Sequence, residues 1–489
     1  MGRLVMLVLV IFTGMQAGFS QERTFHASDS ITYSLYLHQD WDRLVKKGKE
    51  ALGAGTDYFY LRMRLGIAYY EKHNYIEAAR QFRRALDFNS LDKDAWTYYY
   101  YSLKFSGQND VITSVNRKIP SFLKQSLKIP ENKFLEMVYA EGGLLTTNNI
   151  SKNSDLNIMG KDQIYGEQLL YGNGRYAHAG VRFRLSDRVK MYVGYNFIEA
   201  DMRKRFEYTL YEAKVDSVVY ESWGYSKYYS FPVTDNQNII DYKVRQNELY
   251  LNATFTLKNE IQIIPAFHYS MLNFPVTEAR YEPQEASDTA YFVYDGQQTF
   301  WFTYERPAYS FTTRNVSTND YLGALSVNKS FSRFNGGISA IYSSLNERKF
   351  FQIDGRLTWF PSGNLNFYST TELRNFLTDK EYRLIFHQVL GGRILSWLWT
   401  EGSVTVGDLS YTSENNGLVI FTITDKIKYR LAMRLIFPLS EHLSFNLRYQ
   451  FLAKEGVYAV FHDSPKGEFR FHSFDYFHNN FFGGIQWNF

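Results

Sequence analysis

Apolar and polar residues alternate with a period of two from about residue 134 to the end of the chain. The clearest stretches are 191–197, 249–257, 351–359 and 443–451, in which every second residue is apolar. Such alternation predicts β-strands with one apolar and one polar face. The strands are about ten residues long or more and carry aromatic residues near the ends of their apolar faces, as membrane-spanning strands do.

Short and long connections alternate between these strands. The short ones are 186–188, 258–260, 329–333, 361–364, 396–398 and 438–442; the long ones lie near 149–172, 198–243, 275–308 and 453–474, with shorter outer ones near 345, 376 and 413. Six short turns and seven outer connections require about 14 strands, with roughly 12 to 16 left open. Backbone N–H and C=O groups in hydrocarbon need internal partners, so such strands must close. We therefore predict an all-β transmembrane antiparallel barrel over residues 131–489.

The C-terminal segment is the most specific feature of this region. Its alternating residues are Phe481, Gly483, Ile485, Trp487 and Phe489, the last of which ends the sequence. This segment resembles the closing strand of bacterial outer-membrane proteins. The resemblance implies contact with outer-membrane lipid and recognition of the terminal aromatic residue by the barrel assembly machinery.

The first twenty residues have the pattern of a secretory signal peptide. Arg3 supplies the positive charge, residues 4–12 form a nine-residue apolar core, and Gly18 and Ser20 suit a cleavage site. A core of this length is too short for a transmembrane helix, which needs about 20 residues. We expect residues 1–20 to be removed and the remaining chain to be exported.

Residues 21–130 have helical periodicity with an internal repeat. A 34-residue period places one repeat start at Phe59 and the next at Lys93. The small and large residues that would let two antiparallel helices pack closely are Leu65, Gly66, Tyr69, Ala78, Phe82 and Ala85. This segment resembles the tetratricopeptide-repeat family, which implies a surface for a protein partner. A helical hairpin outside that family is the alternative. Pro130 ends the helical region.

Composition and charge exclude several other classes of protein. The chain has 489 residues, no Cys, 40 Tyr and 40 Phe, and its mean hydropathy is −0.36. The missing Cys excludes a disulfide scaffold and a thiolate metal site. The formal net charge is only +4, without long basic runs, so we expect no nucleic-acid partner. A barrel with a polar lumen accounts for a chain that is aromatic and yet polar on average.

Basic residues recur on the predicted inward faces. Pairing across 186–188 places Arg184 opposite Lys190 and Arg182 opposite Tyr192, and pairing across 438–442 places Arg434 opposite Asn446. The expected lumen basic cluster, toward the end with the short turns, is Arg182, Arg184, Lys190, Lys428, Arg430, Arg434 and Arg448. It would form either a constriction that favours anionic solutes or polymers or a ladder of ion pairs with inward carboxylates such as Asp354, Glu372 and Glu401.

One pattern resembles a catalytic site. His268 and Ser270 share one face of a strand, as in the H-x-S arrangement of outer-membrane lipid hydrolases. In those families the pair faces lipid, whereas here Phe267, Tyr269 and Met271 occupy the apolar face, so the pair should face the lumen. We therefore expect no catalytic, cofactor-binding or metal-binding residues and no enzyme activity.

Taken together, the chain resembles bacterial outer-membrane proteins in which periplasmic tetratricopeptide repeats precede a β-barrel. The resemblance implies a channel or export protein whose repeats dock a periplasmic or envelope protein, with polysaccharide or another envelope polymer as a candidate cargo. The alternative is a non-conducting outer-membrane scaffold for an envelope-assembly or secretion complex. In either case the helical domain should lie in the periplasm.

Overall fold

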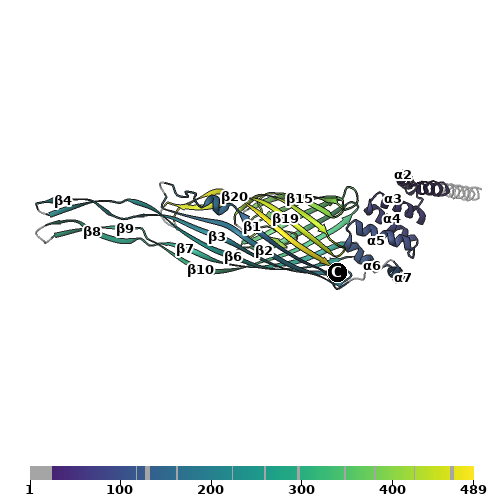
Figure 1. Cartoon of the computed structure of the whole chain (residues 1–489), viewed down its shortest axis with the longest axis horizontal. Coiled ribbons are helices and arrows are strands. Elements are labelled where there is room, and N and C mark those ends of the chain that lie inside the picture. Colours follow the sequence, from purple (N-terminus) through teal and green to yellow (C-terminus); the bar gives the residue numbers. More distant parts are fainter. Residues whose placement is uncertain are drawn as a thin grey trace, which may run out of the picture.

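Fourteen antiparallel strands close into one barrel in a computed structural model of the chain, with helices at one end and long hairpins at the other (Figure 1). The structure describes residues 25–116, 118–126, 133–160, 163–222, 224–257, 260–293, 298–345, 348–378, 381–422, 424–462 and 467–489. We call the two ends of the barrel the helical end and the hairpin end. The expected signal peptide and Pro130 lie outside the described residues.

The barrel confirms the predicted fold class, including the strand number. The strands in order around it are β1 (Leu135–Thr147), β2 (Tyr165–Ser186), β3 (Val189–Tyr211), β6 (Val233–Thr256), β7 (Ile261–Tyr281), β10 (Tyr309–Phe331), β11 (Phe334–Leu345), β12 (Arg348–Trp359), β13 (Phe367–Leu377), β14 (Tyr382–Leu395), β15 (Leu398–Val406), β18 (Lys426–Pro438), β19 (Leu443–Phe461) and β20 (Phe469–Asn488). The ring closes between β1 and β20, where Val138 lies opposite Trp487.

The outer face of the barrel is apolar over most of its circumference. Exposed outward-facing residues include Leu144, Leu249, Leu325, Ile338, Ile353, Leu373, Leu390, Leu431, Leu447, Phe481 and Ile485. Exposed Phe331, Trp359, Phe367, Trp397 and Trp487 add an aromatic belt near the six short turns. A water-soluble protein does not expose a continuous apolar band of this kind, whereas a bilayer-spanning barrel requires one.

The hairpin end differs from the expectation of long loops over 198–243 and 275–308. Strands β3, β6, β7 and β10 continue beyond the other strands and lead into a four-stranded sheet of β4 (Lys214–Glu221), β5 (Gly224–Ser230), β8 (Gln284–Val293) and β9 (Gln298–Arg306) (Figure 1). These segments contain Tyr, Val and Thr at a density that favours strands. Their apolar residues alternate less cleanly because both faces of this sheet are largely exposed to solvent.

The N-terminal part of the described chain is helical. Residues 25–37 are helical, and they are followed by α2 (Trp41–Gly53), α3 (Phe59–Glu71), α4 (Tyr75–Phe88), α5 (Lys93–Phe105), α6 (Asn109–Asn116) and α7 (Ser121–Ser126). Side chains of Asp40, Asn74 and Asp92 cap α2, α4 and α5, which explains where these helices begin. None of the helices in the described residues is long and apolar enough to cross a bilayer.

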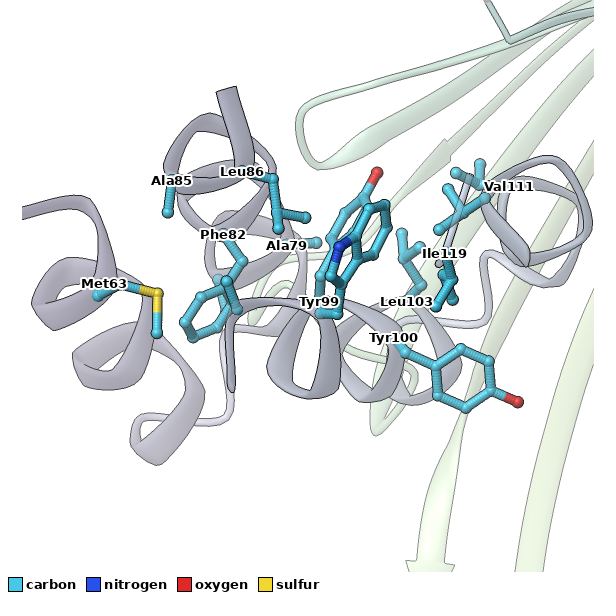
Figure 2. Packing of buried hydrophobic residues seen from close by; sticks show 14 of the residues in the cluster. Met63, Ala79, Phe82, Ala85, Leu86, Tyr99, Tyr100, Leu103, Val111 and Ile119 are labelled. Carbon is cyan, nitrogen blue, oxygen red and sulfur yellow. The ribbon is translucent and has the colours of Figure 1, made fainter. Parts of the chain in front are cut away.

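Small residues let these helices pack closely. Figure 2 shows the cluster of buried apolar side chains between the helices. A Cβ atom added to Gly66 would lie 2.6 Å from the ring of Phe82, so only glycine permits this approach of α3 and α4. Leu65, Ala78 and Ala85 are fully buried and Tyr69 nearly so. Helices α3 and α5 begin at Phe59 and Lys93, 34 residues apart. The tetratricopeptide-repeat assignment itself stays a prediction.

The helices dock on the short turns of the barrel. The Ile76 backbone N–H donates to the Gly363 carbonyl at 3.0 Å, and the Asn364 side chain donates to the His73 carbonyl at 2.8 Å. Arg83 pairs with Glu260 at 3.2 Å. Helix α4 and His73 just before it, together with Glu260 and the turn 360–366, therefore form one contact surface at the mouth of the barrel.

We expect Gly363→Ala to loosen this docking. Gly363 has φ +69°, and an added Cβ would collide with the side chain of Asn74, which caps α4. The left-handed conformation alone costs a non-glycine residue about 1–3 kcal/mol. Hydrogen exchange should become faster in α4 at Ile76 and unchanged in strand β12. Gly355→Ala is the matched control, since a Cβ there meets nothing within 4 Å. Equal protection of α4 in the two variants would contradict the docking role.

Candidate functional site in the barrel lumen

The connection between β15 and β18 does not leave the barrel but folds into it. We call residues 407–425 the lumen loop. It begins at Gly407, which has φ +120°, and carries a minimal hairpin of β16 (Ser413–Glu414) and β17 (Val419–Ile420). Residues 409–414 of this loop are buried, although the segment is polar in sequence. It therefore lies inside the lumen and is not an exposed outer loop.

Three consecutive left-handed residues turn the tip of the lumen loop. Asn415, Asn416 and Gly417 have φ values of 52°, 58° and 83°. Asn and Gly tolerate this conformation best, which explains why they occupy the tip. A side chain on Gly417 would also collide with Leu322 of strand β10. The tip is thus shaped to reach the opposite wall of the barrel.

The tip is hydrogen-bonded to strands β6, β7 and β10. The Tyr250 hydroxyl donates to the Asn416 carbonyl at 3.2 Å, and His268 Nδ1 lies 2.6 Å from the Gly417 carbonyl oxygen. The Asn416 amide contacts the Ser326 hydroxyl and donates to the Ile264 carbonyl at 3.3 Å. Since β15 and β18 lie on the other side of the ring, the loop spans the lumen.

The base of the loop is held by a buried ion cluster. The Glu414 carboxylate accepts from Arg374 at 2.7 Å and from two nitrogens of Arg430 at 2.8 Å, and all three side chains are less than one-tenth exposed. Next to it, the Gln352 amide donates to the Ser413 carbonyl at 2.9 Å and accepts from the Ser413 N–H at 3.1 Å. Glu414 therefore joins the loop to strands β13 and β18.

Charge on Glu414 is strongly favoured by this arrangement. Burial raises the pKa of the carboxyl, but the guanidinium groups of Arg430 and Arg374 more than offset it, so the pKa lies well below its ordinary range. The carboxylate is ionised at every physiological pH. Its removal would leave two buried guanidinium groups without their shared partner.

Apolar contacts complete the seat of the loop. Leu409 is fully buried against Ile385, Ile427 and Leu452. The Tyr411 ring packs on Phe350, with 5.4 Å between the ring centroids. Polar contacts at the tip and apolar contacts at the base both hold the loop, so it is a fixed obstruction in this conformation.

The lumen loop separates two cavities. A cavity of about 280 Å³ lies toward the helical end and has a polar lining that includes Arg182, Lys190, Asn252, Thr254 and Arg356. A second cavity of about 540 Å³ lies toward the hairpin end, and we call it the upper cavity. Its lining is largely apolar and includes Ile198, Met202, Val244, Leu272 and Phe274 together with residues 418–421 of the loop.

The structure disperses the expected lumen basic cluster among several ion pairs. Arg184 and Lys190 share Glu136, Arg448 contacts Glu141 at 2.6 Å, and Arg434 lies 3.6 Å from Glu401. Arg430 belongs to the Glu414 cluster. Lys428 lies in the hairpin-end half of β18 and pairs with Glu455 and Asp475, because that strand starts at the hairpin end. Arg182 stacks near the Tyr192 ring.

One expected strand register is wrong. Arg184 lies opposite Lys190 and Arg182 opposite Tyr192, as predicted, but Arg434 lies opposite Arg448 and not Asn446. The last pair before the turn joins Pro438 to Ser444, two residues later than the sequence pattern implied. Two arginines consequently meet across β18 and β19. Glu401 on the neighbouring strand β15 and Glu141 on β1, one strand beyond β20, balance them.

His268 and Ser270 face the lumen, as predicted, and both are buried. His268 serves the lumen loop: its Nδ1 contacts Gly417 and its Nε2 lies 3.5 Å from Glu248. No hydrogen bond joins His268 to Ser270 among the described contacts, and the Ser270 hydroxyl has no described partner. The pair thus lacks the geometry of a base and its nucleophile. Within the described residues, no cluster of His, Asp and Glu could hold a metal ion.

Sequence reasoning missed the lumen loop. It placed a short outer connection near residue 413 and did not single out Glu414, Asn416 or Gly417. The signals that the sequence does contain are the Asn-Asn-Gly tripeptide, which favours a tight turn, and an isolated Glu within a short, partly apolar segment. Neither signal shows that the turn points inward.

Comparisons with known proteins give a weak likeness in fold. No family model matches the chain, and no curated protein matches it. Solved structures that match are Omp33 of Acinetobacter baumannii (7% identity, 73% of this chain and 100% of that chain, TM-score 0.32), a bacterial polysaccharide outer membrane secretin (9%, 73% and 100%, 0.31) and a Pseudomonas aeruginosa FadL homologue (9%, 73% and 90%, 0.31). Likeness at this level carries no argument about activity or substrate.

Proposed function

We propose that the chain is an outer-membrane transport barrel in which the lumen loop is the gate. The single observation that carries this proposal is the loop itself, which crosses the lumen between two cavities and is held by specific contacts at both its tip and its base. Channels are gated where the pore is constricted, and the loop is such a constriction here. The apolar outer face and the aromatic belt support placement in a bilayer.

The proposed orientation places the helical end in the periplasm. Short turns face the periplasm and long connections face outward in barrels of this class, and the helices dock on the short turns. We propose that the helical domain binds a periplasmic or envelope protein beside the mouth of the barrel. Its exposed Tyr60, Phe88, Leu91 and Phe122 support such a contact.

A small solute suits the lumen better than a polymer. The resemblance to outer-membrane barrels with periplasmic repeats suggested polysaccharide as a cargo. Much of the upper-cavity lining is apolar, however, and that part offers a sugar chain no hydrogen bonds. The loop also remains attached at both ends, so it can swing aside only as far as its own length allows. We therefore propose passage of one small molecule at a time.

Locking the gate tests this function. Because the chain has no Cys, Ser326→Cys combined with Asn416→Cys introduces a single possible disulfide between side chains that are already in contact. In planar bilayers the unmodified protein should show brief openings. The oxidised double variant should show none, and reduction should restore them. Each single variant is the control for the effect of substitution alone.

A non-conducting scaffold is the competing function, and the filled lumen favours it. In that case neither the locked protein nor a protein without the loop would conduct, and all partner binding would depend on residues 21–130. If conductance appears only when the disulfide is reduced, the scaffold function is contradicted. If no variant conducts under any condition, the proposal that the loop is a gate is contradicted.

A further inference from the structure

The upper cavity has an apolar side and a cationic side. Ile198 and Met202 of β3, Val244 of β6, and Leu272 and Phe274 of β7 form the apolar side. Strands β19 and β20 supply the other side with Lys454, His478 and Asn480. A volume of about 540 Å³ falls within the ordinary range for small-molecule sites.

Lys454 is the one cation of this lining that has no ion-pair partner among the described residues. The two other cations that line the cavity are both paired, Arg430 with Glu414 and Arg448 with Glu141. The Lys454 side chain is nearly buried, at 5% exposure, and no described carboxylate lies within the 4 Å of an ion pair. Its ammonium group lies 5.9 Å from the centre of the Tyr171 ring and 5.8 Å from that of Tyr476.

The neighbours of Lys454 point to a missing hydrogen-bonding group. Lys454 lies opposite Tyr476 in the ladder, beside the pair of Leu452 and His478. His478 Nε2 is buried without a hydrogen-bond partner in the described structure and can donate to an anion when it carries the proton. Asn480 Oδ1 is also buried without a partner, but it needs a donor and so does not itself favour an anion. Asp425 attracts Lys454 electrostatically, but its carboxylate accepts from the Tyr476 hydroxyl at 2.7 Å.

A buried ammonium group with no described carboxylate within ion-pair distance is costly, and a ligand anion in contact with it would reduce that cost. We propose that the upper cavity binds an amphipathic monoanion, with its carboxylate at Lys454 and His478 and its apolar body against β3, β6 and β7. This proposal rests on the proposed function and names the class of its cargo. The bound molecule would lie against residues 418–421, directly on the gate.

The cavity explains why both halves of such a ligand are needed. The apolar body gains affinity from each buried methylene, about fourfold per group from the usual transfer free energy. The carboxylate gains an ion pair in a site from which water is largely excluded. An uncharged molecule of equal length should therefore bind more weakly, and a short anion such as acetate should not bind measurably.

Binding to the full chain in lipid nanodiscs tests the proposal, with dodecanoate and dodecan-1-ol as the probes and empty nanodiscs subtracted. The unmodified protein should bind dodecanoate at least tenfold more tightly than dodecan-1-ol. Lys454→Met should weaken dodecanoate binding at least tenfold and leave dodecan-1-ol binding within about threefold. Leu272→Trp, which fills the apolar side, should weaken both.

The matched control is Lys243→Met. Lys243 is a paired cation in β6 that does not line the cavity, and its removal should change neither affinity. Circular dichroism of each variant confirms folding before binding is measured. Equal dodecanoate affinity in Lys454→Met and the unmodified protein would overturn the proposal, as would absence of dodecanoate binding. The gate is tested separately by conductance, so failure of one proposal is distinguishable from failure of the other.

Discussion

Replacing residues 409–424 with a Gly-Gly-Ser-Gly linker is expected to convert the barrel into a constitutively open pore. Strands β15 and β18 are hydrogen-bonded neighbours, with Val406 opposite Tyr429, so a short linker joins them without disturbing the ring. The deletion removes the element that crosses the lumen. Barrels with 8 strands are filled by side chains and those with 16 leave an aqueous channel, so 14 strands should leave a continuous path. Single-channel recording should show time-averaged conductance raised at least about tenfold.

The matched control removes a segment of similar length from outside the lumen. Residues 214–230, the hairpin of β4 and β5, extend from the hairpin end, and their side chains contribute nothing to either cavity lining among the described residues. Their replacement by a two-residue turn should leave conductance unchanged. A loop-deleted protein that folds but stays closed would show that other side chains seal the lumen and would refute the gate.

Glu414→Ala is the point substitution with the largest expected effect. It leaves the guanidinium groups of Arg374 and Arg430 buried and without their shared partner, a loss that costs about 3–5 kcal/mol in comparable sites. The substitution leaves the hydrogen bonds between the neighbouring strands intact. It therefore destabilises the closed conformation of the loop and not the barrel. The open fraction of the loop should therefore rise by about 10²–10⁴-fold.

A cysteine reporter measures this fraction. The chain has no Cys, so Ser413→Cys is the only site for a membrane-impermeant maleimide. This position is buried while the loop is seated, and its hydroxyl has no described partner, so its labelling rate follows loop opening. Asp241→Ala is the control, since Asp241 pairs with Arg203 through two bonds of 2.7 and 2.9 Å but is largely exposed. That loss should cost less than about 1 kcal/mol. Labelling rates that agree within threefold between Glu414→Ala and the parent would contradict the proposal that Glu414 anchors the loop.

Protonation of Glu414 should release the loop, as Glu414→Ala is expected to do, but only at strongly acidic pH. The folded-state pKa of Glu414 is lowered overall, so its stabilising contribution is complete above the ordinary Glu pKa of about 4.3 and is lost as pH falls toward the lower folded-state value. The reporter at Ser413→Cys should keep the same accessibility at pH 8 and pH 5, after correction for the pH dependence of the maleimide reaction. Opening between those values would point to a different titrating group.

The barrel was predictable because its physical constraints repeat along the chain. Alternation over each strand and the placement of six short turns both derive from local sequence, and they led to 14 strands. The outward direction of Phe481, Ile485 and Trp487 follows from the same period. The error at Arg434 arose at a turn, where a shift of two residues preserves every side chain's face and so leaves no trace in the pattern.

The candidate site was not predictable in the same way. The inward path of residues 407–425 depends on contacts with Tyr250, His268 and Ser326, which are remote in sequence. Alternation places basic residues on inward faces but does not assign their partners, which come from other strands. Whether Arg430 lines an open pore or seats a loop depends on Glu414, a residue that alternation cannot assign to either face.

The path of the lumen loop also sets a requirement on the order of assembly. The contact of His268 with Gly417 joins residues 149 apart, and the bond from Thr146 to the Asn479 carbonyl across β1 and β20 joins residues 333 apart. Contacts so distant in sequence form slowly, because the chain must lose much entropy before any interaction compensates for it. While β1 and β20 are still unpaired, the incomplete ring leaves the most room for the loop to enter the lumen. The loop should therefore take its place before the last seam closes, which makes a barrel closed without its loop a kinetic trap during insertion.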